Sequence, residues 1–500
     1  MMQKKYYITT PLYYVNASPH IGHSYTTIAA DCLARYWRAL LGKENVRFLT
    51  GTDEHGQKIQ KAADEAGLAP QAFADRVSKQ FRELWKQLDV SCDDFIRTTE
   101  ERHIKTVQRA LEILYSKGEI YASQYEGWYC TPCETFWIGS QLQESRCPDC
   151  KRQVEKITEN NYFLRLKKHQ KWLMDYIEAN PSFIRPESRR NETLGFLRNN
   201  ELSDLCISRP RERLSWGIPL PFSPGHVTYV WFDALLNYIS AVGEFDASGR
   251  YVSPWWPADV QLMAKDILRQ HAVYWPIILH ALDIEPPRCV FAHGWWLMQD
   301  TKMSKSLGNV VSPVDVSARF GVDAYKYFLL RDVPFGLDGN FSQEAIVKRF
   351  NADLANDLGN LAHRTATMLE KYCAGRIPAD VSRAPGNGGE IIKEADFLKG
   401  QVASAMDALD FGAALERIWA VIGLANKYVE ETKPWNLSKE GRVPELEAFL
   451  GVLAAALRSI ASELAPFMPH TAGAISEQFS CEVLKKGLPL FPRIEKKQTP

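Results

Sequence analysis

The sequence lacks several features that would place it in a specialised class. Its 500 residues carry 60 acidic and 60 basic side chains, so the formal net charge is zero. That balance excludes a uniformly basic nucleic-acid coat and an acidic disordered tail, and any contact with nucleic acid must come from local patches. The first residues lack the apolar core of a signal peptide, and no apolar run is long enough to span a bilayer. We therefore expect a cytoplasmic protein.

Cysteine is present, but not in the pattern of a disulfide framework. Of ten cysteines, six are scattered through apolar surroundings, which is typical of small buried side chains in a reducing compartment. The other four form two C-x₂-C pairs, Cys130 with Cys133 and Cys147 with Cys150. This spacing indicates a structural zinc site with four thiolates, and we expect the metal to supply much of the local folding energy. Two redox pairs are the alternative, but they lack a thioredoxin-like context.

Hydrophobic patterning predicts several domains, because 500 residues are too many for one core. Residues 6–15 and 46–50 are predicted as buried strands around a helix that ends at Gly42, which makes a βαβ unit. The α/β pattern continues with a helix over 71–88, a strand at 227–231, a helical run over 265–282 and a strand at 288–292. Between them, from about residue 119, a segment rich in tyrosine, tryptophan and cysteine is typical of an insertion. After residue 306 the periodicity is almost purely helical.

The stretch Pro-His-Ile-Gly-His at residues 19–23 has the composition of an anion site. It lies between a predicted strand and a helix expected to begin near Tyr25. The start of a helix has unpaired N–H groups at the positive end of its dipole, which suits a phosphate. Gly22 allows another backbone or a flat ring to approach, and His20 and His23 can both donate to phosphate oxygens. Residue types alone leave open a turn with two surface histidines.

Two further segments carry polar side chains of the kind that bind nucleotides. Lys302 and Lys305 lie in a loop rich in serine, glycine and asparagine, where two ammonium groups could neutralise charge on a triphosphate. Such a loop by itself is also typical of a solvated surface. The sequence Gly-Thr-Asp-Glu-His-Gly at 51–56 is predicted as a polar turn after a strand, where open parallel sheets bind ligands.

Taken together, these segments resemble the class I aminoacyl-tRNA synthetases, whose paired signatures are a His-Ile-Gly-His turn and a Lys-Met-Ser-Lys-Ser loop. Both are present unchanged. Within that class the chain is similar to the methionyl-tRNA synthetase family, in its bacterial form with a single zinc knuckle, from about Tyr6 to past Trp435. The supporting stretches are residues 11–16, 51–56, 229–234, 265–267 and 293–294.

The resemblance implies an α/β fold in which a Rossmann-type parallel-sheet catalytic domain is split by a zinc-binding insertion and followed by an all-α helical bundle that binds the anticodon. The expected bounds are 1–117 for the first half of the catalytic domain, 118–224 for the connective insertion with the zinc knuckle, 225–299 for the second half, 300–356 for the lysine loop and linking region, and 357–500 for the anticodon-binding domain.

The implied reaction has two steps. L-methionine attacks the α-phosphate of ATP, giving methionyl-adenylate and pyrophosphate, and the methionyl group then passes to the 3′ end of tRNA(Met), including initiator tRNA. Mg²⁺ is expected on the ATP, and no protein nucleophile is needed. The resemblance implies catalytic roles for His20, His23, Lys302 and Lys305. It implies ATP contacts from His20, Gly22, His23, Asp266, His293, Gly294 and Lys305.

For the amino acid, the resemblance implies that Asp53 holds the substrate ammonium with help from the Leu12 carbonyl. A thioether offers little to hydrogen-bond, so recognition must use shape and contacts between sulfur and aromatic rings. The implied methionine-binding positions are Leu12, Tyr14, Asp53, Trp231, Ala234, Tyr238, Ile267, His271 and Trp275. By residue type alone, the aromatic members are also typical of core packing, and His271 of a core histidine.

For the tRNA, the resemblance implies that Asn360, Arg364 and Trp435 read the anticodon. Asparagine and arginine can hydrogen-bond base edges, and an indole can stack on an unstacked base. Alternatively, Trp435 follows Pro434 and could merely cap a helix end. Two positions depart from the family pattern: Leu235 where proline is frequent, next to the methionine pocket, and Ala264 where glycine is usual, next to the nucleotide.

Rival interpretations come from two classes. Synthetases for leucine, isoleucine or valine would need a much longer insertion, and one for cysteine a zinc ion inside the active site; another nucleotidyltransferase could share the histidine turn. An RNA-binding module with an inactive nucleotide fold is the non-enzyme alternative, and the intact residues His20, His23, Lys302, Lys305 and Asp53 argue against it. Many relatives carry a further dimerising module that is not seen before Pro500, so a monomer is expected.

Overall fold

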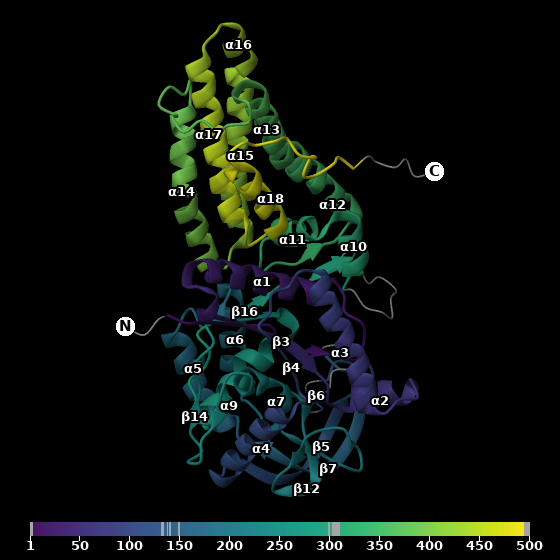
Figure 1. Cartoon of the computed structure of the whole chain (residues 1–500). Coiled ribbons are helices and arrows are strands. Elements are labelled where there is room, and N and C mark those ends of the chain that lie inside the picture. Colours follow the sequence, from purple (N-terminus) through teal and green to yellow (C-terminus); the bar gives the residue numbers. More distant parts are fainter. Residues whose placement is uncertain are drawn as a thin grey trace. The chain divides into compact units, whose positions relative to one another are not determined.

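The computed structural model describes residues 4–131, 135–137, 139, 142–148, 151–298, 301–302 and 311–494. The chain divides into two compact units. The first comprises residues 1–30 and 37–293, and the second comprises residues 31–36 and 294–500. Figure 1 shows a first unit built around a β-sheet and a second unit that is mostly helical.

A parallel sheet organises the first unit. Among the described residues it has seven strands in the order β2-β3-β1-β15-β16-β8, with β4 pairing with β3, and every pairing is parallel. This confirms the predicted α/β class. The strands are β1 Tyr6–Thr9, β2 Tyr13–Tyr14, β3 Val46–Asp53, β4 Asp94–Arg97, β8 Ile184–Arg185, β15 Val260–Ala264 and β16 Val290–His293.

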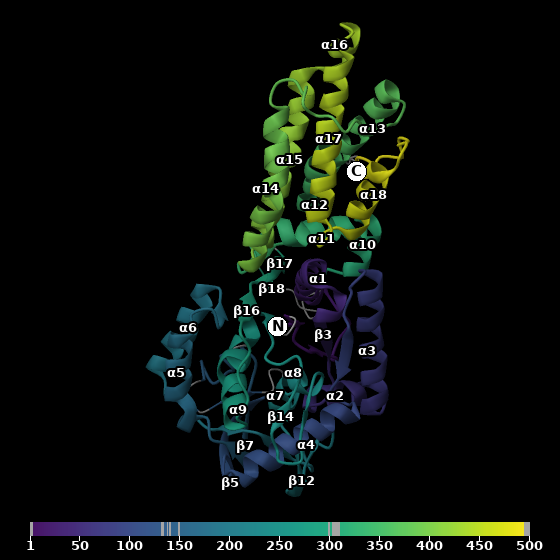
Figure 2. The same ribbon diagram turned by 60° about the vertical axis from the view of Figure 1, so that its left-hand side comes forward.

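Burial on both faces explains the sequence of these strands. In β3 every residue except Arg47 is buried, so burial does not alternate along the strand, and its first half carries the apolar residues Val46, Phe48 and Leu49. Figure 2 shows α3 and α6 on opposite flanks of the sheet. The helices of this unit are α1 Ile21–Leu41, α2 Gln57–Glu65, α3 Pro70–Gln87, α4 Glu101–Ser116, α5 Gln170–Ala179, α6 Glu187–Asn199, α7 Val230–Leu235, α8 Asn237–Ser240 and α9 Trp275–Ala281, with short 3₁₀ or π turns at Lys43–Asn45, Lys167–His169, Lys265–Ile267 (η4) and Gln270–Tyr274 (η5).

The segment predicted as an insertion forms an antiparallel sheet in the order β6-β5-β7-β9. It also returns to the main sheet, because β8 pairs with β16 through Ile184 and Val290. A separate three-stranded sheet, β10-β12-β11, follows. The strands are β5 Ile120–Cys130, β6 Thr135–Trp137, β7 Glu155–Leu164, β9 Leu205–Cys206, β10 Ser208–Pro210, β11 Pro219–Leu220 and β12 Ser223–Thr228, with a hairpin of β13 Glu244–Phe245 and β14 Tyr251–Val252.

The strand predicted at 227–231 is wrong beyond Thr228. β12 ends there, and the helix α7 begins at Val230. The run Val-Thr-Tyr-Val-Trp favours a strand by composition. However, a helix buries Phe232, Ala234 and Leu235 together, and this burial overrides the local propensity.

The second unit confirms the predicted helical domain. Helices α14, α15 and α17 run side by side in both views (Figures 1 and 2). The helices are α10 Pro313–Phe320, α11 Val322–Arg331, α12 Gln343–Arg349, the π-helix η7 Phe350–Gly359, α13 Asn360–Cys373, α14 Gly388–Asp407, α15 Phe411–Thr432, α16 Pro434–Lys439, α17 Val443–Leu464 and α18 Pro469–Ser480; the small sheet is β17 Trp296–Met298, β18 Thr301–Lys302 and β19 Gly339–Asn340. Over the part of the chain that the structure describes, none of the helices combines the length and the apolar character that crossing a bilayer requires.

Candidate functional site

The main sheet has a switch point between β1 and β15. On one side of β1 lie β3 and β4, and on the other lie β15 and β16. Open parallel sheets bind ligands outside the carboxyl ends of their strands at such a point. The segments that leave β1 and β15 at this edge carry Leu12, the histidine turn and Asp266, all of which the sequence singles out. The topology therefore supports a site at this edge.

His20 and His23 cap the helix that follows them. α1 begins at Ile21, not near Tyr25, and His20 is its N-cap. Nδ1 of His20 accepts from the Gly22 N–H at 3.1 Å, and Nδ1 of His23 accepts from the His20 N–H at 3.1 Å. A neutral imidazole that accepts at Nδ1 carries its proton on Nε2. Both rings, with centroids 3.9 Å apart, therefore carry the donor that a phosphate oxygen requires.

The glycine of this turn makes room for a histidine ring. A Cβ atom at Gly22 would lie 3.0 Å from Cε1 of His20 and 3.2 Å from its Nδ1. The expected close approach of a flat ring is thus made by the first histidine of the same turn. An alanine at this position would press on the ring that caps the helix.

His293 and Gly294 have structural partners of their own. His293 ends β16, and its Nε2 lies 2.7 Å from Oγ1 of Thr26 in α1, while its ring centroid lies 4.9 Å from that of Tyr25. In the second unit, a Cβ at Gly294 would meet the carbonyl of Leu337 at 2.2 Å, so only glycine fits. The remaining predicted ATP residue of the first unit, Asp266, is exposed in η4.

Asp53 is the last residue of β3, so the polar turn predicted at 51–56 starts inside the strand. Asp53 is 8% exposed and pairs in register with Tyr14 of β2. The next residue, Glu54, is fully buried and receives two bonds from Arg97, at 2.7 and 2.8 Å, and one from Thr99 at 2.6 Å. Asp53 is therefore held between a strand and a tightly bonded neighbour.

Tyr238, His271 and Trp275 form a buried aromatic cluster. Nδ1 of His271 lies 2.9 Å from the carbonyl of Ile267, which can only accept, so Nδ1 carries the proton. Nε2 then accepts from the Tyr238 hydroxyl at 2.7 Å. Burial lowers the pKa of His271 to about 4, so the ring is neutral at physiological pH. The Trp275 indole donates to Gln261 at 3.1 Å. The cluster offers a neutral, apolar surface.

The predicted methionine positions differ in burial. Leu12, Tyr14, Trp231 and Ile267 are partly buried, whereas Ala234, Tyr238, His271 and Trp275 are buried. We expect such a division if the partly buried side chains form the wall of a pocket and the buried ones support that wall from the core.

The two departures from the family pattern cause no strain. Leu235 ends α7 with 2% exposure and packs in the core. Ala264 has φ −79° and ψ 152°, which is ordinary extended backbone, so glycine is not required before η4.

The lysine loop and the cysteine pairs are described only in part. Lys302 lies in β18, while Lys305 falls outside the described residues. Cys130 and Cys147 are fully buried in one small cluster with Trp137. Their predicted partners Cys133 and Cys150 also fall outside. Within the described residues, no three histidine, cysteine or acidic side chains are grouped to hold a metal.

In the second unit, Asn360 begins α13 and is exposed, and Arg364 follows one turn later on the same helix face. A cleft of about 560 Å³ lies beside Asn360, lined also by His363, Asn426 and Phe491. Trp435 is the second residue of α16 and is 44% exposed. An exposed indole at a helix end is accessible for stacking.

Sequence reasoning missed three buried polar residues of the first unit: His55, His103 and Asp233. Two of them lie in stretches that carry the family resemblance, at 51–56 and 229–234. Only Asp233 stands out locally, as an aspartate in an apolar run, whereas His55 and His103 lie in polar stretches, and no spacing rule links residues so far apart in sequence.

Comparison with known proteins agrees with this geometry. The family model described as tRNA synthetases class I (M) matches residues 6–158 and 139–366, and the model of the anticodon-binding domain of tRNA ligases matches 389–495. A methionine–tRNA ligase of Clostridium tetani is 48% identical over 513 residues, covering 99% of this chain and 79% of that relative. One from Caldanaerobacter subterraneus is also 48% identical, with 99% and 80% covered. The structure of Mycobacterium tuberculosis methionyl-tRNA synthetase bound by methionyl-adenylate superposes with a TM-score of 0.91 at 40% identity, covering 98% of this chain and 100% of that one.

Proposed function

The chain belongs to the class I tRNA synthetases specific for methionine, and from this premise we propose how its residues share the reaction. It is a methionine–tRNA ligase. It activates L-methionine with ATP to methionyl-adenylate and pyrophosphate, then transfers methionine to the 3′ end of tRNA(Met). The assignments below concern which side chains act at each step.

Activation is a displacement at phosphorus without a protein nucleophile, so positioning and charge stabilisation carry the rate. The observation that carries our assignment is the capped turn: Nδ1 of His20 and of His23 is bonded within the turn, which leaves Nε2–H as the donor of each ring. These donors would hold the ATP phosphates at the head of α1. Lys302 and Lys305 would neutralise the departing pyrophosphate, and Mg²⁺ would arrive bound to ATP.

Methionine would lie at the switch point of the sheet. Asp53 would pair with its ammonium, and the Leu12 carbonyl would accept a second bond. The side chain would lie against Tyr14, Trp231 and Ile267, backed by Ala234, Tyr238, His271 and Trp275. The bond between Tyr238 and His271 supports this assignment, because it satisfies both polar groups internally and leaves a surface suited to a thioether.

The second unit would read the tRNA. We assign Asn360 and Arg364 to the edges of anticodon bases and Trp435 to stacking, as the exposure of Asn360 and Trp435 allows. Initiator tRNA would be a substrate as well, because it carries the same anticodon.

A structural zinc ion would be held by Cys130, Cys133, Cys147 and Cys150. The burial of Cys130 and Cys147 in one cluster fits such a site, and the backbone turns back after Cys147, whose carbonyl accepts from the Lys151 N–H at 2.9 Å. The metal would stabilise the insertion and take no part in the chemistry. We further propose that the protein works in the cytoplasm as a monomer.

The direct test is ATP–pyrophosphate exchange with each amino acid in turn. We expect exchange with methionine, and Lys305→Ala should slow it by roughly 10²- to 10³-fold while the KM for methionine barely changes. Lys171→Ala, at a lysine whose side chain is 86% exposed on α5, is the matched control and should exchange normally. Normal exchange by Lys305→Ala would remove its role, and faster exchange with another amino acid would overturn the substrate.

A further inference from the structure

A chain of hydrogen-bonded side chains crosses the interior of the first unit. Nδ1 of His55 lies 2.7 Å from Oδ2 of Asp233, and Nε2 of His103 lies 2.7 Å from Oδ1 of the same carboxylate. Nδ1 of His103 lies 2.8 Å from Oγ of Ser240. The exposed fractions are 5% for His55 and zero for Asp233 and His103. None of these residues has a role in the assignments above.

The directions of these bonds follow from proton counting. An ionised carboxylate only accepts, so His55 donates through Nδ1 and His103 through Nε2. Burial would raise the pKa of Asp233, but the two histidines outweigh burial and hold that pKa below its usual value. Both oxygens of Asp233 are therefore bonded, and a carboxylate held from two sides has little freedom to rotate.

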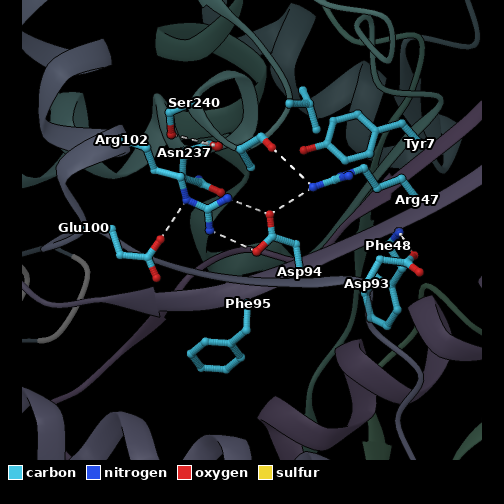
Figure 3. Close-up of polar contacts among 12 residues, drawn as sticks. Tyr7, Arg47, Phe48, Asp93, Asp94, Phe95, Glu100, Arg102, Asn237 and Ser240 are labelled. Carbon is cyan, nitrogen blue, oxygen red and sulfur yellow. Dashed lines mark hydrogen bonds and ion pairs between the residues drawn. The ribbon is translucent and has the colours of Figure 1, made fainter.

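One end of this hydrogen-bond chain lies on elements that further bonds hold in place. His103 lies in the first turn of α4, where the neighbouring Arg102 bonds both oxygens of Asp94, at 2.8 and 2.9 Å. Figure 3 shows Asp94 between Arg47 and Arg102, and also the contact of Ser240 with Asn237, whose carbonyl lies 3.2 Å from the Ser240 hydroxyl. This end of the hydrogen-bond chain is thus fixed to β4, α4 and α8.

The other end of this hydrogen-bond chain adjoins residues assigned to the methionine site. His55 follows Asp53 by two residues, with Glu54 between them bonded to Arg97. Asp233 follows Trp231 by two residues and precedes Ala234 in α7. One hydrogen bond, from His55 to Asp233, therefore joins the segment that holds the substrate ammonium to the helix that contacts the thioether.

We propose that Asp233 is a positioning residue for methionine: through His55 it sets the distance between the carboxylate of Asp53 and the wall formed by Trp231 and Ala234. The proposal rests on the assigned methionine site. A substrate held at its charged end and its apolar end depends on the spacing of the two, and a misplacement of about 1 Å can cost as much as 100-fold in rate. Asp233 itself touches no substrate.

The test uses the full-length enzyme and Asp233→Asn, in which the amide keeps one of the two bonds. We expect the KM for methionine in pyrophosphate exchange to rise at least 10-fold while the KM for ATP stays within about twofold. Glu119→Gln, at a buried carboxylate that contacts Lys168 and His169 and lies outside this hydrogen-bond network, is the control and should change neither value. Equal KM values for methionine in the wild type and Asp233→Asn would overturn the proposal.

A second readout separates positioning from a general loss of structure. L-methioninol and 4-(methylthio)butan-1-ol differ only in the amino group, so the ratio of their inhibition constants measures the ammonium contact. We expect Asp233→Asn to reduce this ratio at least fivefold, whereas uniform damage to the pocket would weaken both inhibitors alike and leave the ratio unchanged, contrary to the proposal. Wild-type exchange with methionine must be seen first; its absence would refute the assigned function instead.

If Asp233→Asn does not fold, the same measurements are made from the His55 side. The amide nitrogen of asparagine lies where Nδ1 of histidine lies, so His55→Asn can still donate to Asp233, whereas His55→Ala cannot. We expect His55→Ala to raise the KM for methionine and His55→Asn to restore most of the loss. Equal KM values in the two variants would show that the bond to Asp233 does not matter.

Discussion

In the histidine turn, hydrogen bonds with the backbone set the tautomer and the orientation of two side chains before a ligand binds. Each imidazole of His20 and His23 uses Nδ1 to accept a backbone N–H of the turn, and this bond decides which nitrogen carries the proton. The helix would otherwise leave these N–H groups without partners in its first turn. The same bonds that cap α1 therefore orient two donors without requiring a positive charge on either ring.

Burial keeps His271 neutral, and its lowered pKa predicts a dependence of folding stability on pH. An unfolded histidine takes up a proton as the pH falls through about 6.5, whereas folded His271 remains neutral down to a pKa of about 4. Below about pH 6.5 the unfolded chain thus binds the extra proton, and stability present at neutral pH is lost as the pH falls, by about 3 kcal/mol at pH 4.

Replacing the histidine should remove that loss. We expect His271→Gln to show a free energy of unfolding that falls by about 2 to 3 kcal/mol less than that of the wild type between pH 7 and about pH 4.5, measured by urea denaturation at each pH. His226→Gln, at a partly buried histidine on β12, is the control. Parallel pH profiles for the wild type and His271→Gln would contradict the neutral state of His271.

At the scale of elements, α1 contributes to both compact units. Its residues 31–36 belong to the second unit, where Oδ2 of Asp31 lies 3.1 Å from Nζ of Lys326 in α11 and 2.9 Å from Nε of Arg35. The side chains of Asp31 and Lys326 are only 1% and 2% exposed. Such a pair is costly to break, because removing one charge leaves the other buried.

This pair predicts an unequal response to two lysine substitutions. Lys326→Met should destabilise the second unit by about 3 kcal/mol, since Arg35 keeps one bond to Asp31. Lys171→Met, which breaks an exposed pair with Asp175 on α5, should cost about 0.5 kcal/mol or less. Urea denaturation followed by circular dichroism measures both. Similar midpoints for the two variants would mean that the buried pair contributes no more than a surface pair.

At the scale of the whole molecule, the chain covers 79% of the length of a relative that matches it over nearly all of its own residues. The two matched family models follow one another along the chain, at 6–366 and 389–495. The cysteine segment lies inside the first of them, so the proposed metal serves the catalytic half of the protein and not the helical half.

Zinc removal tests this placement. Native mass spectrometry should find about one zinc ion per chain, because four thiolates complete one tetrahedral site. Cys147→Ser should lose the metal and melt at a lower temperature, whereas Cys481→Ser, at an exposed cysteine of the helical unit, should retain both properties. A wild-type protein that is stable and free of metal after purification in zinc-containing buffer would refute the site.

Much of the fold was predictable because its signals are local. The strands predicted at 6–15 and 46–50, the helix that ends at Gly42 and the helical periodicity after residue 306 all reflect burial patterns within one element, although the first run forms two strands, β1 and β2, instead of one. The predictions that failed required knowledge of partners. The start of α1 depends on the bond that the Gly22 N–H donates to Nδ1 of His20, and the helix at 230–235 depends on the core that buries it.

The sequence by itself determined the chemistry and the kind of domains: two signature segments, a carboxylate at a strand end and a helical second half carry their meaning in residue type and order. Only the tertiary structure decided which residues distant in sequence are joined by a hydrogen bond or lie side by side. It pairs β8 with β16, bonds Tyr238 to His271, and brings His55 and His103 to Asp233. The reason is physical: periodicity reports which face of an element is buried, whereas a hydrogen bond between side chains 178 residues apart exists only once the chain has folded.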